Sequence, residues 1–104
     1  MIVVNTEVLA KFVRKHRDAG TWLQRWLQTT ESAEWMSLDD VRDDFPSADG
    51  VPLAKGLVIV TVFNVRGNTY RMTTLISYVK QIVSIQDVMT HAEYDKNKWK
   101  ARYE

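Results

Sequence analysis

Apolar residues in the first third of the chain recur at helical spacing. A short β-branched start, residues 1–5, is typical of a strand. Two sets of apolar residues then repeat as i, i+1, i+4 and i+5, which places each set on one face of a helix. These sets are Val8, Leu9, Phe12 and Val13, and then Trp22, Leu23, Trp26 and Leu27. The pattern predicts two helices, one after residue 6 and one over residues 19–33, joined as an antiparallel hairpin.

Polar residues mark where helices begin. The Thr6 hydroxyl can cap the first helix by accepting a hydrogen bond from a free backbone N–H. Ser37, followed three residues later by Asp40, resembles a capping box and predicts a short helix over residues 38–44. The next stretch, FPSADGVP at residues 45–52, has the composition of a loop.

The second half of the chain changes to the pattern of strands. Residues 57–65 are almost continuously apolar, which is typical of a buried strand. Residues 69–78 and 82–89 predict two more strands, and the turns RGN and VKQ separate the three. Strands joined by such short turns form an antiparallel meander.

The helical hairpin needs an apolar surface, and the sheet is the only candidate. We therefore expect a single α+β domain, residues 1–104, built as a two-layer sandwich. The N-terminal strand belongs to this fold, and both long helices should pack on one face of an antiparallel sheet, leaving the other face open for a ligand. Four side chains of the helices should be largely buried: Leu9, Phe12, Trp22 and Trp26.

Composition adds limits to this picture. Hydrophobic residues make up 45% and charged residues 26% of the 104 positions, as in ordinary globular domains. No apolar run approaches the roughly 18–20 residues that a membrane-spanning helix needs. The first residues lack the basic and apolar regions of a secretory signal, so we expect a cytoplasmic protein without membrane contact. The absence of cysteine excludes disulfides and thiolate zinc sites.

Charge is distributed unevenly, although the net charge is only +1. Residues 1–50 carry 6 Lys+Arg and 9 Asp+Glu, whereas residues 51–104 carry 8 Lys+Arg and 4 Asp+Glu. A basic C-terminal half favours a polyanionic partner. The lysine-rich end also fits a solvated tail, and charge by itself does not separate the two.

Three motifs, in this order and spacing, resemble the HigB toxins of the RelE/ParE-like superfamily: FPSAD (45–49), VFNVRGNTYR (62–71) and THAEYDK (90–96). The resemblance covers essentially the whole chain. It implies the toxin of a type II toxin–antitoxin system, an endoribonuclease that cleaves messenger RNA on the ribosome and inhibits translation and growth. It also implies a HigA-like helix-turn-helix antitoxin as partner. HigB toxins commonly have glycine where Arg66 stands and lysine where Thr69 stands.

RNA can be cleaved without a metal if its 2′-OH attacks the adjacent phosphate. The reaction needs a proton carrier, a cation that stabilises the phosphorane and a hydrogen-bonding group that positions the substrate. These needs, with the resemblance, indicate Arg71, His91 and Tyr94 as catalytic residues. Seven further residues are expected to bind RNA: Lys55, Asn64, Arg66, Asn68, Lys96, Lys98 and Lys100. No cofactor is expected.

Each catalytic candidate also has a structural interpretation. His91 either transfers a proton or makes a hydrogen bond at the end of the last strand. Arg71 should project from the open face, where its guanidinium makes bidentate phosphate contacts; otherwise it pairs with Asp87 across the sheet. Tyr94 can donate to phosphate, stack on a base, or carry a proton if basic neighbours lower its pKa; otherwise it seals the edge of the core. Asp95 should orient His91 or Lys96.

Other polar residues favour structural roles. Asn64, Arg66 and Asn68 could contact RNA backbone or could simply form the hairpin turn with Gly67. His16 suits the charge at the end of the first helix. The acidic run DDVRDD (39–44) is explained by helix-cap acidity and a solvated face, and no ligand spacing for a metal is present.

Two other kinds of protein fit the same scaffold. One is a non-catalytic, ParE-like toxin that acts on DNA gyrase through protein contacts. The other is an inactive relative that only binds its antitoxin. The presence of Arg71, His91 and Tyr94 favours the ribonuclease.

Overall fold

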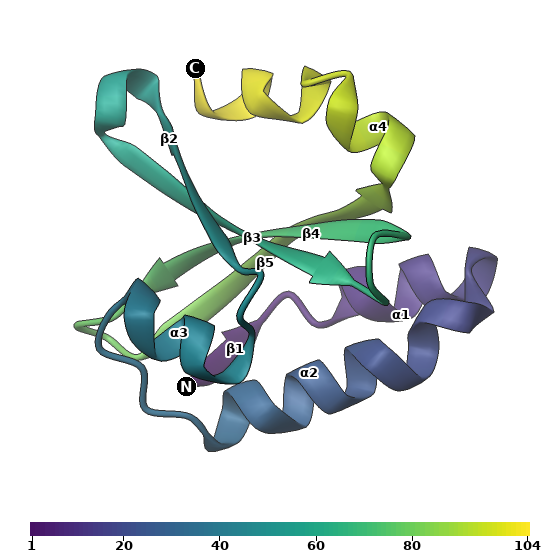
Figure 1. Ribbon diagram of the computed structural model, residues 1–104, viewed down its shortest axis with the longest axis horizontal. Helices are drawn as coiled ribbons and strands as arrows, with labels where there is room; N and C mark the ends of the chain where they lie inside the picture. Colours follow the sequence, from purple (N-terminus) through teal and green to yellow (C-terminus); the bar gives the residue numbers. More distant parts are fainter.

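A five-stranded sheet forms the middle of the protein (Figure 1). The computed structural model describes residues 1–104. The strands lie in the order β1-β5-β4-β3-β2. Their bounds are β1 Ile2–Val4, β2 Asp49–Leu53, β3 Val58–Val65, β4 Tyr70–Ser77 and β5 Ile82–Thr90. Strands β3, β4 and β5 form the predicted antiparallel meander, whereas β1 pairs with β5 in parallel, so the sheet is mixed.

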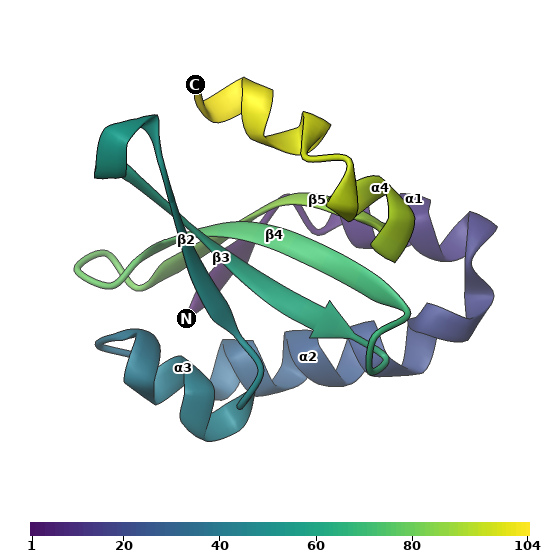
Figure 2. The same cartoon turned by 45° about the horizontal axis from the view of Figure 1, so that its top comes forward.

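Helices cover one face of this sheet (Figures 1 and 2). They are α1 Glu7–Lys15, the 3-10 helix η1 Arg17–Ala19, α2 Gly20–Ser32 and α3 Leu38–Asp44. The predicted α+β fold, with both long helices on the same face, is confirmed. Leu9 and Trp26 are buried as predicted, but Phe12 and Trp22 are only partly buried. None of the helices is long and apolar enough to cross a membrane.

The main core lies between these helices and the sheet. Trp26 of α2 meets Phe63 of β3 edge to face, with ring centroids 5.4 Å apart. Alternate residues of a strand point to opposite faces, so Phe63 and Val65 enter this core while Val62 and Asn64 point the other way. In β4, Tyr70 and Met72 enter the core, and Arg71 therefore lies on the opposite face.

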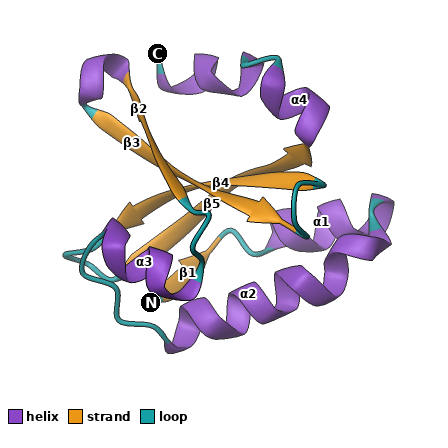
Figure 3. Ribbon diagram, viewed as in Figure 1, coloured by secondary structure: helices purple, strands orange, loops and turns teal.

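The prediction that the opposite face is open is wrong. The C-terminal segment folds over it as α4 His91–Asp95 and the 3-10 helix η3 Lys98–Tyr103 (Figures 2 and 3). A second core cluster forms there from Leu53, Val60, Val62, Met89 and Trp99. The physical reason is the aromatic content of the segment: Trp99, flanked by Tyr94 and Tyr103, removes apolar sheet surface from water.

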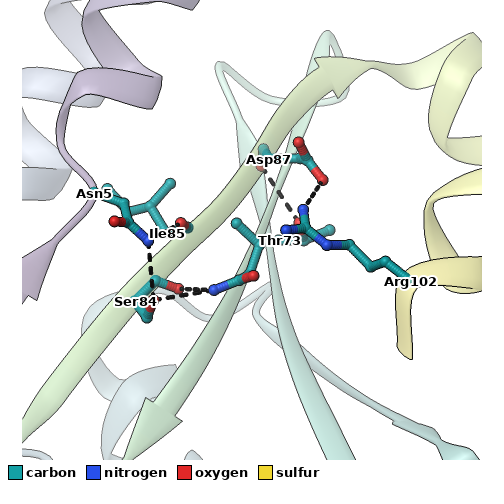
Figure 4. A network of polar contacts seen from close by, with 7 residues as sticks. Asn5, Thr73, Ser84, Ile85, Asp87 and Arg102 are labelled. Carbon is teal, nitrogen blue, oxygen red and sulfur yellow. Dashed lines mark hydrogen bonds and ion pairs between the residues drawn. The ribbon is translucent and has the colours of Figure 1, made fainter. Parts of the chain in front are cut away.

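An ion pair also fastens the C-terminal segment to the sheet. Arg102 reaches Asp87 of β5, with 2.7 Å between the guanidinium and the carboxylate (Figure 4). Thr73 of β4 donates its hydroxyl hydrogen to the carbonyl of Asp87 at 3.5 Å, next to this pair. The residues after 97 are therefore part of the folded domain and do not form a solvated tail.

The stretch predicted as a loop contains the edge strand β2. Asp49 to Leu53 pair in register with Val62 to Val58 of β3. Arg42 of α3 supports the entry into the strand, because its Nε donates to the carbonyl of Ala48 at 2.9 Å. Pro52 is compatible with an edge strand, which needs backbone hydrogen bonds on one side only. Pairing with β3 therefore outweighs a local composition typical of turns.

Neither predicted helix cap has the expected geometry. The Thr6 side chain makes no capping hydrogen bond, since Thr6 already has helical backbone angles and the turn is made by Asn5 at φ 67°. Ser37 makes no side-chain cap either. Asp40 instead accepts from the backbone N–H of Met36 at 2.8 Å, one residue earlier than the capping box requires.

The β3–β4 hairpin turns through two residues with positive φ, Arg66 at 53° and Gly67 at 66°. The predicted turn role of Gly67 is confirmed, but the second left-handed residue is Arg66 and not Asn68. Glycine adopts this conformation without the steric cost that a Cβ atom adds, so the conformation is less favourable for Arg66 than for Gly67. Asn68 is thereby released from turn formation, and its side chain turns to Arg71.

Candidate functional site

Arg71 is a buried cation without an anionic partner. Its side chain lies under the C-terminal segment and is 9% exposed. The guanidinium donates to the carbonyl of Tyr70 at 3.0 Å and to Oδ1 of Asn68 at 3.3 Å. Both acceptors are neutral, and no carboxylate forms an ion pair with Arg71. The alternative pairing with Asp87 does not occur, because Asp87 lies opposite Thr73 and binds Arg102.

The prediction that Arg71 projects from an open face is therefore wrong, because the side chain is buried. Its surroundings are nevertheless suited to binding an anion. Burial of a cation without a counter-ion costs free energy, so such residues are rare where they serve the fold alone. The two neutral acceptors fix the plane of the guanidinium and leave other N–H groups unused. A fixed guanidinium with free donors is suited to bind a bidentate oxyanion such as a phosphate.

Tyr94 of α4 packs beside Arg71. Its ring stacks on Trp99, with centroids 5.2 Å apart and planes at 14°, and the Arg71 Cζ atom lies 5.8 Å from the ring centroid. Burial raises the pKa of Tyr94, and the Asp49 carboxylate raises it further; the opposing effect of Arg71 is smaller. The condition under which Tyr94 could carry a proton, a pKa lowered by basic neighbours, is therefore not met. Tyr94 remains a neutral phenol that can donate a hydrogen bond.

The other tyrosines behave in the same way, which leads to a prediction about stability. A hydrogen bond to Asp18 raises the pKa of Tyr70, and burial raises the pKa values of Tyr78 and Tyr103. Above pH 10.0, the ordinary pKa of tyrosine, the folded protein therefore holds more protons than the unfolded chain. We expect the free energy of unfolding to decrease as the pH rises through this range.

Urea denaturation at pH 8 and at pH 10.5 measures this effect. The variant Tyr94→Phe should lose less stability than the wild type between the two pH values, because it has one fewer group to ionise. A free energy of unfolding that rises between pH 8 and pH 10.5 would contradict the raised pKa values of the tyrosines.

The position of His91 is fixed by the start of α4 and by the carboxylate of Asp95. Thr90 caps α4 in a capping box, in which the Thr90 hydroxyl accepts from the Glu93 N–H at 3.2 Å and Glu93 accepts from the Thr90 N–H at 3.2 Å. The His91 Nδ1 atom then lies 2.8 Å from Oδ2 of Asp95. Of the two partners expected for Asp95, His91 is therefore the one observed. The ring is not used for a strand-end hydrogen bond, which the His91 backbone N–H makes to Thr69 at 3.3 Å.

The second ring nitrogen of His91 is available for chemistry. Nε2 has no hydrogen-bond partner in the chain, and the side chain is 44% exposed. A neutral imidazole that donates from Nδ1 to a carboxylate presents Nε2 as a proton acceptor. His91 and Tyr94 are three residues apart in α4 and thus share one side of the helix. Since α4 packs on β4 and β5, it lies against the strand that carries Arg71, and Tyr94 is the member of the pair that contacts Arg71.

Comparison with known proteins identifies the family. A family model described as HigB_toxin, a RelE-like toxic component of a toxin–antitoxin system, matches residues 19–97, which is more than half of the chain. The chain belongs to the HigB toxin family. A search of curated proteins gave no match. Membership implies an antitoxin as partner, and the matched range includes the strands and the helix that hold Arg71, His91 and Tyr94.

Two of the predicted RNA-binding residues of this toxin lie next to Arg71. Asn64 is its direct neighbour across β3 and β4, and Asn68 binds its guanidinium. Arg66 turns to the helical layer, where it pairs with Asp18 at 3.0 Å. Lys55 lies in the connection η2 (Ala54–Gly56) at the opposite end of β3 from the hairpin, far from Arg71.

The predicted lysines of the C-terminal segment form a separate surface. Lys96 and Lys98 line a groove of about 410 Å³ beside Asp87 and Met89 of β5. The Lys100 Nζ atom lies 5.7 Å from the Trp99 ring centroid. Lys96 and Lys98 therefore face the groove beside β5, and Lys100 lies against the Trp99 ring.

Two features that hold the site residues in place were not predicted from the sequence. The capping box of Thr90 and Glu93 sets the start of α4, and its T-x-x-E pattern was readable in THAEYDK. Trp99 holds Tyr94 in place, but nothing in its sequence neighbourhood distinguishes a buried from a surface tryptophan. His16 has a packing role: its ring stacks on Phe12 with centroids 4.4 Å apart. No group of three or more His, Cys, Asp or Glu residues could hold a metal ion.

Proposed function

We propose that this HigB-family toxin is an endoribonuclease that cleaves messenger RNA on the ribosome, in the cytoplasm, and thereby inhibits translation and growth. The nucleophile is the 2′-OH of the RNA itself, so cleavage needs no metal. A HigA-like helix-turn-helix antitoxin holds the toxin inactive. The observation that carries the proposal is the buried Arg71 guanidinium, which has two neutral acceptors and no anionic partner.

Arg71 binds the scissile phosphate in this mechanism. Its free N–H groups point to the phosphate oxygens, and the charge that develops on the phosphorane is stabilised by a donor whose orientation is fixed beforehand. Asn68 keeps the guanidinium in plane through the 3.3 Å hydrogen bond. Tyr94, held neutral by burial, donates a hydrogen bond to a phosphate oxygen or to the leaving 5′-oxygen.

His91 transfers the proton. Nε2 accepts the 2′-OH proton when the ring is neutral, or donates to the 5′-oxygen when the ring is protonated. In either direction Asp95 stabilises the imidazolium and keeps Nε2 directed to the substrate. Asp95 is therefore a positioning residue. Whether His91 acts as the general base or the general acid depends on where the 2′-OH and the 5′-oxygen of the bound RNA lie relative to Nε2.

The experiment that tests the proposal is incubation of purified toxin with messenger RNA, with and without ribosomes, in the presence of EDTA. We expect cleavage to survive EDTA and the upstream fragments to end in 2′,3′-cyclic phosphate. Growth arrest without RNA cleavage, with inhibited DNA supercoiling, would instead favour the gyrase-directed alternative. Absence of both effects would favour an inactive relative.

The lysines of the C-terminal segment should supply salt-dependent RNA binding. Replacing Lys96, Lys98 and Lys100 together with alanine removes up to three phosphate contacts, which should reduce the slope of log affinity against log salt by about 2 for single-stranded RNA. Filter binding between low and moderate salt measures the slope. The matched control replaces Lys11, Lys15 and Lys80, which carry the same total charge on other surfaces. Equal slopes for the two variants would show that the segment does not contact RNA.

A further inference from the structure

Asp18 of η1 holds both ends of the turn between β3 and β4. Its Oδ2 atom accepts a hydrogen bond from the Arg66 guanidinium at 3.0 Å, and its Oδ1 atom accepts from the Tyr70 hydroxyl at 2.6 Å. Arg66 begins the turn, and Tyr70 is the first residue of β4. Figures 1 and 2 show this turn beside the N-terminal helices. One carboxylate therefore joins the helical layer to both sides of the hairpin.

The core fixes both partners of the Asp18–Tyr70 hydrogen bond. Ala19, the neighbour of Asp18, is fully buried. The Tyr70 ring is also buried and meets Phe12 of α1 edge to face, with ring centroids 5.1 Å apart. The hydrogen bond to Asp18 raises the pKa of Tyr70, so the hydroxyl keeps its proton at neutral pH and continues to donate. This hydrogen bond therefore joins two parts of the molecule that have little freedom to move.

The turn has little packing of its own. Residues 66–69 are exposed, and none of them adds a side chain to either core cluster. The Thr69 hydroxyl donates to the Arg66 carbonyl at 2.9 Å, which closes the turn but does not attach it to the rest of the protein. Arg66 also has a left-handed backbone, with φ at 53°, which a Cβ atom makes less favourable. Exposed segments with few packed contacts open easily, so the contacts to Asp18 decide where the turn lies.

The same hairpin supplies both acceptors that orient Arg71. These are the carbonyl of Tyr70 at 3.0 Å and Oδ1 of Asn68 at 3.3 Å. Tyr70 thus binds Asp18 through its hydroxyl and Arg71 through its carbonyl, and Asn68 lies between the two residues that Asp18 holds. A displacement of the turn would move both acceptors, and the guanidinium with them. A misplacement of about 1 Å in a reacting group can cost roughly 10²-fold in rate.

We infer that Asp18 is a positioning residue of the site: it fixes the β3–β4 turn so that Asn68 and the Tyr70 carbonyl hold the Arg71 guanidinium in the orientation that binds the scissile phosphate. The inference rests on the proposed ribonuclease function and adds a residue of the helical layer to its site. The Asp18 and Arg66 side chains are 42% and 54% exposed, so their ion pair should add little to the free energy of unfolding. The effect of Asp18 should therefore appear in the cleavage rate.

Replacing Asp18 with alanine removes both contacts to the hairpin. With excess enzyme over a short RNA, the cleavage rate should decrease by about 10–10²-fold, whereas RNA affinity should change little. Asp18→Asn keeps an oxygen that accepts from the Tyr70 hydroxyl, so it should lose less. Glu34→Ala is the matched control, because Glu34 is exposed, forms no ion pair and carries the same charge. It should cleave at the wild-type rate, and urea denaturation should verify that all three variants are folded.

A double-mutant cycle with Arg71→Lys shows whether Asp18 acts through Arg71. Lysine cannot use the planar geometry that the two acceptors impose on the guanidinium. Asp18→Ala should therefore have little further effect on the rate in the Arg71→Lys background. A residue that only stabilises the fold would reduce the rate by the same factor in both backgrounds. That result, or a wild-type rate in Asp18→Ala, would overturn the inference.

NMR without RNA separates this inference from the proposed function. The side-chain amide signals of Asn68, assigned with Asn68→Ala, should shift or broaden in Asp18→Ala and stay in place in Glu34→Ala. Shifted Asn68 signals in a protein that cuts no RNA would refute the ribonuclease and retain the positioning of the guanidinium. Cleavage of RNA by wild type and Asp18→Ala at equal rates, with identical Asn68 signals, would refute the role of Asp18 and retain the ribonuclease.

Discussion

Replacing His91 with glutamine should reduce RNA cleavage by about 10²–10⁴-fold, the usual contribution of a general acid or base. Glutamine keeps a hydrogen-bonding side chain near Asp95, but its amide neither gains nor loses a proton near neutral pH and so cannot act as a general acid or base. RNA affinity should change little, because phosphate attraction comes mainly from Arg71 and the lysines. Rates measured with excess enzyme over a short RNA report the chemical step without product release.

The second histidine provides the matched control. His16 stacks on Phe12 and lies far along the chain from α4, so His16→Gln should cleave RNA at near the wild-type rate once folding is verified by circular dichroism. Asp95→Asn should lose less activity than His91→Gln, since it removes the orienting carboxylate and keeps the imidazole. If His91→Gln retained the wild-type rate, Tyr94 and Arg71 would be left as the only candidates for catalysis.

Replacing Arg71 should separate activity from stability. Arg71→Lys keeps the charge but loses the planar guanidinium, and cleavage should decrease by about 10²–10³-fold, as when a preorganised donor to a developing oxyanion is removed. Arg71→Met should abolish cleavage, whereas the free energy of unfolding should stay equal or increase by about 1 kcal/mol or more, because an unpaired buried cation is removed.

Urea denaturation and cleavage assays on the same preparations test both parts. Arg25→Lys is a suitable control, because Arg25 is exposed on α2 in the opposite layer and forms no ion pair. It should leave both the rate and the stability unchanged. A lower free energy of unfolding in Arg71→Met would indicate that Arg71 stabilises the fold. Full activity in Arg71→Lys would show that Arg71 contributes only its positive charge and no bidentate contact to phosphate.

The residues of the site could be predicted individually, but their environments could not. Arg71, His91 and Tyr94 were identified from residue chemistry and motif resemblance, and the structure brings Arg71 and Tyr94 into contact. Two partners, His91 and Lys96, were expected for Asp95, and the spacing of four residues within α4 explains why His91 is the one observed. The raised pKa of Tyr94 was not predicted, because the burial of its side chain depends on Trp99 and the sheet, which local sequence does not reveal.

The sequence by itself determined the elements whose signal is local. Helical periodicity placed α2, a local polar pattern placed α3, and apolar runs separated by short turns placed strands β3 to β5, each within one or two residues, because the residues that define such an element are close in sequence. It also determined the family, since the motifs around the hairpin and α4 are contiguous.

Tertiary structure decided what depends on residues distant in the chain. The strand β2 exists because residues 49–53 find β3, although their composition is typical of a loop. The parallel pairing of β1 with β5 joins the two ends of the sequence. Above all, the packing of Trp99 on Met89 and Val62 closes the second face, which buries Arg71 and turns an expected surface charge into a fixed, unpaired cation. Such contacts are selected by the total apolar surface removed from water, a property that no local stretch of sequence contains.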